Sequence, residues 1–199
     1  MIRSIGILIM IAGAVQQPTP ADALRRQDVY AIYSTMISNA SSSNRIDSSP
    51  VFAIAATTKP AMAYDSTPYP CIVPPQEYAN RWTEVLTDFN ARRDTPLALE
   101  RELKLSKPYV YLNPDEVSGF VNPQRTTPSQ PLAVPAGQER KGVFTLSDVY
   151  FNKDRTLALT GVSFWCGSMC SSSHWEIYEK SSDGTWKEVR PSRNCYQEA

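Results

Sequence analysis

The C-terminal part of the chain constrains the fold most, because strand-forming and turn-forming segments alternate there. Residues rich in β-branched and aromatic side chains fill four segments, 142–151, 155–166, 174–180 and 186–189. Turn residues separate them, as in Asn152-Lys153-Asp154 and Ser182-Asp183-Gly184. Strands that follow one another through short turns pair as an antiparallel meander. We therefore expect a four-stranded antiparallel sheet at this end of the chain.

The N-terminal half instead shows apolar residues at helical spacing. A helix is predicted over 25–40, with one apolar stripe formed by Val29, Ile32, Tyr33, Met36 and Ile37. A second is predicted from about residue 78 to 90–93, with a stripe formed by Tyr78, Trp82, Val85, Leu86 and Phe89. Helices that precede strands indicate an α+β domain, with the N-terminal helices packed on one face of the C-terminal meander.

Shorter elements are expected between these regions. Residues 51–58 and 109–112 are typical of strands, and 113–116 of a turn. Pro96 can begin a short helix that carries Leu97, Leu99 and Leu103. Four prolines among polar residues predict a mobile surface loop at 122–140. Residues 24–199 are thus expected to form a single domain.

The first 23 residues are typical of a cleavable secretory signal peptide. Arg3 precedes an apolar run from Ile5 to Val15, well below the roughly 20 residues that a membrane-spanning helix needs. Ala21-Asp22-Ala23 offers small residues for cleavage after Ala23, and Ala12-Gly13-Ala14 is a second possible site. A buried N-terminal helix is the alternative. We expect a periplasmic or extracellular protein whose mature chain does not insert into a membrane.

The charge balance gives no indication of a polyanionic partner. The chain has 20 basic and 20 acidic residues, and cleavage after Ala23 removes one of each sign, so the net charge stays at zero. This excludes no small ligand, but it argues against binding to nucleic acid. Four basic residues lie close together in sequence, and we interpret them as solvated turn charges, with a ligand surface as the alternative: Arg140, Lys141, Lys153 and Arg155.

The four cysteines are even in number, which in an exported protein indicates disulfides. Three pairings are possible, and the sequence does not choose among them. We favour Cys166 with Cys170, which would close a small loop between two strands. Cys71 would then pair with Cys195, and closing this long loop would stabilise the folded state by about 4–5 kcal/mol in the chain-entropy model.

Other chemistry is possible around His174, which is the only histidine. Cys166, Cys170 and His174 are spaced four apart, as zinc ligands on a helix would be, but the segment is not predicted to be helical. A redox-active dithiol is a further alternative, although its motif usually has two residues between the cysteines. No Gly-x-Ser-x-Gly motif accompanies the histidine. We therefore expect no metal and no cofactor.

One stretch carries a family resemblance. Leu146-Ser147-Asp148-Val149-Tyr150-Phe151-Asn152 continues through Lys153-Asp154-Arg155-Thr156 to Leu157-Ala158-Leu159, and Cys166-Gly167-Ser168-Met169-Cys170 follows. This resembles a group of uncharacterised bacterial secreted proteins with an FN-x-x-x-T-x-A-L strand pair and a CGxxC loop. The resemblance implies the strand unit and secretion, and it implies no activity. Ser171, Ser172 and Ser173 replace the glycines usual after the second cysteine.

The sequence thus predicts an exported domain that is non-enzymatic and binds an unknown ligand or an envelope partner. A secreted hydrolase or a thiol-redox enzyme is the alternative. The aromatic residues of the predicted sheet favour core packing over a stacking surface for sugar or peptide. They are Tyr150, Trp165, Trp175, Tyr178 and Trp186.

Overall fold

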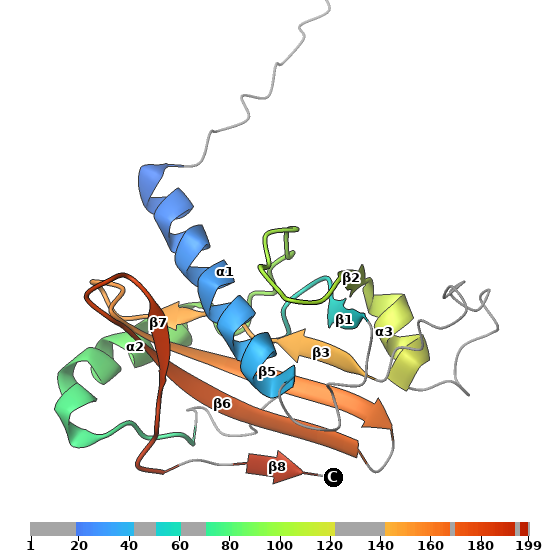
Figure 1. The fold of residues 1–199 in the computed structure, drawn as a ribbon. Helices are drawn as coiled ribbons and strands as arrows, with labels where there is room; N and C mark the ends of the chain where they lie inside the picture. Colours follow the sequence, from blue (N-terminus) through green and yellow to red (C-terminus); the bar gives the residue numbers. More distant parts are fainter. Residues whose placement is uncertain are drawn as a thin grey trace, which may run out of the picture.

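The computed structural model describes residues 19–41, 51–60, 71–121, 142–167, 170–193 and 196–198. It shows an α+β fold, as the sequence predicts, with helices around one mixed sheet (Figure 1). The strands are β1 (Phe52–Ala55), β2 (Tyr109–Leu112), β3 (Val143–Leu146), β4 (Tyr150–Phe151), β5 (Leu157–Gly167), β6 (Cys170–Lys180), β7 (Trp186–Val189) and β8 (Tyr196–Glu198). The predicted Pro-rich loop at 122–140 lies outside the described residues.

The sheet is larger than the predicted meander. Its order is β2-β1-β3-β5-β6-β7, with β4 beside β5 and β8 beside β6. The β3-β5-β6-β7 part is antiparallel, as expected, but β1 pairs in parallel with both β2 and β3. All four residues of β1 are buried, as is usual for a strand between parallel neighbours. The prediction of a four-stranded meander was therefore incomplete.

The predicted strand 142–151 is interrupted in its middle. The Ser147 hydroxyl accepts a hydrogen bond from the Gly161 amide at 2.7 Å and donates one to the Asp148 carbonyl at 2.7 Å. The Tyr33 hydroxyl donates to the Ser147 carbonyl, also at 2.7 Å. These side-chain bonds satisfy groups that a continuous ladder would pair, so β3 ends and β4 begins separately.

Helix α1 (Pro20–Ser41) covers one face of the sheet and begins earlier than predicted. The Thr19 hydroxyl accepts from the Asp22 amide at 3.2 Å, and the Asp22 carboxylate accepts from the Thr19 amide at 3.1 Å. This reciprocal capping, with Pro20 at the first helical position, extends the helix by a turn. The predicted stripe is confirmed, since Ile32, Tyr33, Met36 and Ile37 are fully buried.

Helix α2 (Ala79–Arg92) follows the 3-10 turn η2 (Gln76–Tyr78) and lies where the second helix was predicted. It packs through Val85 and Phe89 onto Leu157 and Leu159. Helix α1 packs instead onto residues that alternate with these along the strands, such as Ala158. Neighbouring residues of a strand face opposite sides of a sheet. The expectation that both helices share one face was therefore wrong (Figure 1).

The helix predicted after Pro96 does not form. The Thr58 amide donates to the Leu97 carbonyl and the Leu99 amide to the Ala56 carbonyl, both across about 3 Å. The Lys104 amide donates to the Ser34 hydroxyl at 2.9 Å. The segment is therefore extended and tied to neighbouring elements.

The turn predicted at 113–116 is the start of helix α3 (Pro114–Val121). The Asn113 and Glu116 side chains cap this helix reciprocally, with hydrogen bonds of 2.7 and 2.9 Å.

Candidate functional site

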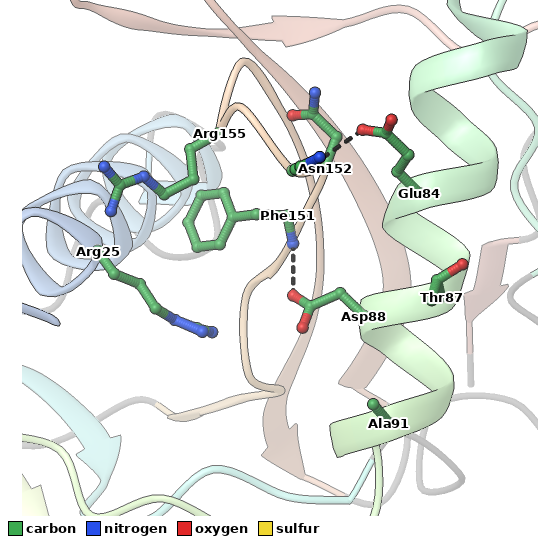
Figure 2. A pocket seen from close by; sticks show the side chains of 9 residues that line it. Arg25, Glu84, Thr87, Asp88, Ala91, Phe151, Asn152 and Arg155 are labelled. Carbon is green, nitrogen blue, oxygen red and sulfur yellow. Dashed lines mark hydrogen bonds between the residues drawn. The ribbon is translucent and has the colours of Figure 1, made fainter. Parts of the chain in front are cut away.

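A cleft of about 540 Å³ opens between the N-terminal half of α1, the β4–β5 turn and α2 (Figure 2). Its lining side chains are Arg25, Glu84, Thr87, Asp88, Ala91, Phe151, Asn152, Lys153 and Arg155. They come from three separate parts of the sequence, which the sheet brings together. Small-molecule sites commonly have volumes of about 300–1,000 Å³, so this cleft has the size of one.

The β4–β5 turn forms one end of the cleft, and Asn152 organises it. The Asn152 side-chain oxygen accepts from the amides of Thr156 and Leu157 at 2.8 and 2.7 Å, and its carbonyl accepts from the Arg155 amide at 3.0 Å. Arg155 has φ of 52°, in the left-handed region that glycine occupies most readily. Hairpin turns of this kind usually place glycine at that position.

Two arginines stand on the same side of the cleft. Arg155 donates through Nη1 to the Ala21 carbonyl at 3.0 Å, and its Nε is 3.9 Å from the Asp28 carboxylate. Arg25 donates through Nη2 to the Val149 carbonyl at 3.0 Å, and its Cζ lies 5.4 Å from the centre of the Phe151 ring. Figure 2 shows this ring between the two side chains. Each cation thus has a backbone contact, and Arg25 also has a ring contact.

The opposite wall is acidic and belongs to α2. Asp88 accepts two hydrogen bonds from Arg92, at 2.7 and 2.5 Å, and one from the Phe151 amide at 2.8 Å. Burial opposes the ionisation of Asp88, but these hydrogen bonds outweigh it and lower the pKa of the carboxyl group. Glu84 accepts from the Lys153 amide at 3.0 Å. Both carboxylates therefore bind the β4–β5 turn to α2 (Figure 2).

Behind the cleft, Asp148 joins the two helices through their arginines. Its side chain is only 3% exposed, and it pairs with Arg92 and, at 3.7 Å, with Arg25. Its carboxylate also accepts from the Val149 amide at 2.7 Å. Arg92 in turn donates to the Val149 carbonyl at 2.8 Å. We call Arg25, Asp88, Arg92 and Asp148 the ion network.

The pKa shifts within the ion network differ in direction. Burial raises the pKa of Asp148, although Arg92 and Arg25 favour its ionised form. Burial likewise opposes the charge of Arg92, yet its acidic neighbours raise the pKa of Arg92. The raised pKa of Asp148 favours a neutral Asp148–Arg92 pair, whereas the raised pKa of Arg92 favours an ionised pair. We take the pair as ionised at neutral pH, because Asp148 accepts hydrogen bonds as a carboxylate does.

The predicted site residues are distributed over several parts of the molecule. Lys153 and Arg155 line the cleft, whereas Arg140 and Lys141 lie outside the described residues. Cys166 and Cys170 are at disulfide distance at the end of the β5–β6 hairpin, with Cα atoms 5.1 Å apart. Cys71 is disulfide-bonded, and Cys195 lies outside the described residues.

His174 contacts Glu176 on the same strand, β6. Its Nε2 lies 2.8 Å from one oxygen of Glu176, and the Tyr178 hydroxyl donates to the other. These three residues alternate along β6 and share the α1 face of the sheet. Among the described residues, no group of three or more His, Cys, Asp or Glu side chains is arranged to hold a metal ion.

Sequence reasoning missed the contribution of Arg25, Asp88 and Asp148 to a site. One signal was present, because Asp88 and Arg92 stand four apart on a predicted helix and such pairs face each other. Nothing local connects either residue with Arg25 or Asp148. The aromatic residues Tyr150, Trp175, Tyr178 and Trp186 are buried, as core packing requires, whereas Trp165 is half-buried and packs against Phe120.

Among the described residues, no helix is long and apolar enough to cross a bilayer. Comparison of the chain with protein-family models, with curated proteins and with solved structures found no match.

Proposed function

We propose that this chain is an exported, non-enzymatic binding domain that holds a small ligand in the cleft between α1, the β4–β5 turn and α2. The observation that carries the proposal is the arrangement of Arg25 and Arg155 around Phe151 at an open cleft. Recognition sites combine an apolar surface with a few fixed polar groups. The ion network holds these polar groups in place, because it connects α1 and α2 to the loop before β4.

Export is the second part of the proposal. The signal peptide would occupy residues 1–23, and the protein would act in the periplasm or outside the cell. The apolar run from Ile5 to Val15 and the small residues Ala21 and Ala23 support this. Cleavage after Ala23 would remove Thr19 and Asp22, which cap α1, and the Ala21 carbonyl that accepts from Arg155. The mature cleft would then have a freer Arg155.

Two disulfides suit that compartment, and the strand register supports the long-range one. Val73 pairs with Arg193 in an antiparallel bridge, and each amide donates to the other carbonyl, at 2.8 and 3.3 Å. Cys71 comes two residues before Val73 in the sequence, Cys195 comes two residues after Arg193, and Cys71 is disulfide-bonded.

A substitution that fills the cleft tests the binding function. Ala91 is exposed, lies on α2 and lines the cleft, so Ala91→Trp would occupy the ligand volume (Figure 2). Asn90→Trp is the matched control, because Asn90 is exposed on the same helix and does not line the cleft.

The assay is ligand-observed NMR with a library of small acids, amines and neutral compounds. We expect some compounds to bind the wild type and Asn90→Trp but not Ala91→Trp. The proposal fails if no compound binds, or if every compound that binds also binds Ala91→Trp.

A further inference from the structure

We infer that the cleft is a site for an oxyanion carried on an apolar group, bound by Arg25, Lys153 and Arg155. A phosphate ester and a carboxylate share this chemistry. The inference rests on the proposed binding function and adds the class of ligand. It follows from the charge balance of the cleft, from the placement of the arginines and from the backbone of Arg155.

The charges of the cleft do not cancel. Three cations and two carboxylates line it, but Arg25 and Asp88 belong to the ion network, in which two arginines and two aspartates balance. Glu84 is the remaining acid and caps the Lys153 amide. Lys153 and Arg155 against Glu84 leave the cleft with one surplus positive charge, which a negative charge on a ligand would balance.

The two arginines use only part of their donors for the protein. Arg25 uses Nη2 for the Val149 carbonyl, and after cleavage removes Ala21 the contact that Arg155 keeps here is the one with Asp28 at 3.9 Å. A guanidinium has five N–H donors in a fixed fork, so each keeps donors for a ligand. The Phe151 ring lies between the two side chains, so a ligand beside the ring would lie near both arginines (Figure 2). Bidentate hydrogen bonds from a guanidinium to an oxyanion are among the strongest that proteins make.

The backbone of Arg155 is an independent observation. A left-handed conformation costs a residue with a β-carbon roughly 1–2 kcal/mol, and glycine would adopt it without that cost. Arg155 has this conformation at φ of 52°. Its exposed hydrogen bond to the Ala21 carbonyl and its long contact to Asp28 offset this cost only weakly. Backbone strain kept at a surface turn points to a functional side chain.

The ligand also has an apolar part. Phe151 and Ala91 line the cleft beside the cations, and Thr87 adds its methyl group. An aromatic or aliphatic group on the oxyanion would cover these side chains, as small-molecule sites usually require. Inorganic phosphate alone would leave most of the cleft empty.

Three probes of similar size separate charge from shape: phenyl phosphate, benzoate and benzamide. At pH 7.5 phenyl phosphate is a dianion, since the second pKa of such phosphates is about 6. We expect calorimetry to show phenyl phosphate binding at least about tenfold more tightly than benzamide, with benzoate between them. Ala91→Trp abolishes all binding.

Arg155→Gly separates binding from folding. We expect this variant to bind phenyl phosphate about tenfold or more weakly, because it loses charged hydrogen bonds, while its Tm does not fall. Arg155→Lys keeps the charge and retains part of the affinity. Arg190→Gln is the control, since Arg190 is exposed and outside the cleft.

Two results would overturn the inference. The first is that benzamide binds as tightly as phenyl phosphate and that Ala91→Trp abolishes its binding. This result would support the binding function but contradict the preference for an oxyanion. An Arg155→Gly variant that binds phenyl phosphate normally, or that unfolds at a lower Tm, shows that Arg155 does not hold the ligand or serves the fold instead. Phosphate and carboxylate ligands are distinguished by the order of phenyl phosphate and benzoate.

Discussion

Arg92→Gln is the substitution that tests the ion network most directly. Arg92 is the common partner of Asp88 and Asp148, and it also donates to the Val149 carbonyl. The variant leaves Asp148, whose side chain is 3% exposed, with the Val149 amide at 2.7 Å and Arg25 at 3.7 Å. A buried carboxylate without its closest cation destabilises the folded state.

Removing one partner of a buried ion pair typically costs about 3–5 kcal/mol. We expect the lower end, about 3 kcal/mol, because Arg92 is itself 25% exposed and Arg25 remains near Asp148. For a domain of this size, that corresponds to a fall in Tm of roughly 6–12 °C. Arg81→Gln is the control on the same helix. Its pair with Glu179 is 2.7 Å long but about one third exposed on each side, so we expect a loss of less than about 1 kcal/mol.

The cost of Arg92→Gln must also depend on pH. Losing Arg92 raises the folded-state pKa of Asp148 further above its unfolded value, so the variant binds a proton more readily when folded. Its stability therefore falls as pH rises through that pKa, and its deficit relative to the wild type shrinks on acidification. Urea unfolding followed by tryptophan fluorescence at several pH values measures this. The reasoning is refuted if Arg92→Gln and Arg81→Gln lose equal stability at pH 7, or if the deficit does not change with pH.

The remaining predictions concern export and the cysteines. N-terminal sequencing of protein from its native compartment is expected to begin at Leu24, and a retained Met1 would contradict the signal peptide. Mass spectrometry of non-reduced digests is expected to find one peptide pair joined through Cys71 and Cys195. Thiol labelling of the same protein is expected to find Cys166 and Cys170 blocked, and reactive thiols there would favour the redox alternative.

Elements that local patterns specify were predictable from the sequence. The stripes of α1 and α2 bury the expected side chains, and β7 spans the predicted residues. Helix α3 was predictable too, because Asn113-Pro114-Asp115-Glu116 has the form of a capping box with proline at the first helical position. The turn residues were recognised there, but their role as a helix start was not.

What the sequence did not show depends on partners far along the chain. Residues 97–104 have helix-compatible leucines, yet the Leu99 amide donates to the Ala56 carbonyl just after β1 and the Lys104 amide to the Ser34 hydroxyl. The parallel pairing of β1 with β2 and β3 has no short-range signal, because parallel strands need long crossovers. The cleft could not be predicted for the same reason, since Arg25 and Arg155 are far apart in sequence and only the fold places both in its lining.

The ion network and the cleft share Arg25, and this links stability to binding in a definite way. Arg25 is held by the Val149 carbonyl and the Phe151 ring before any ligand arrives. A ligand then meets a cation whose orientation is already fixed, which lowers the entropy cost of binding. Arg155, in contrast, raises the energy of the folded backbone. Arg25 therefore stabilises the fold and would also bind the ligand, whereas Arg155 would serve the ligand alone. Loss of Arg155 should thus weaken binding without lowering the stability of the fold.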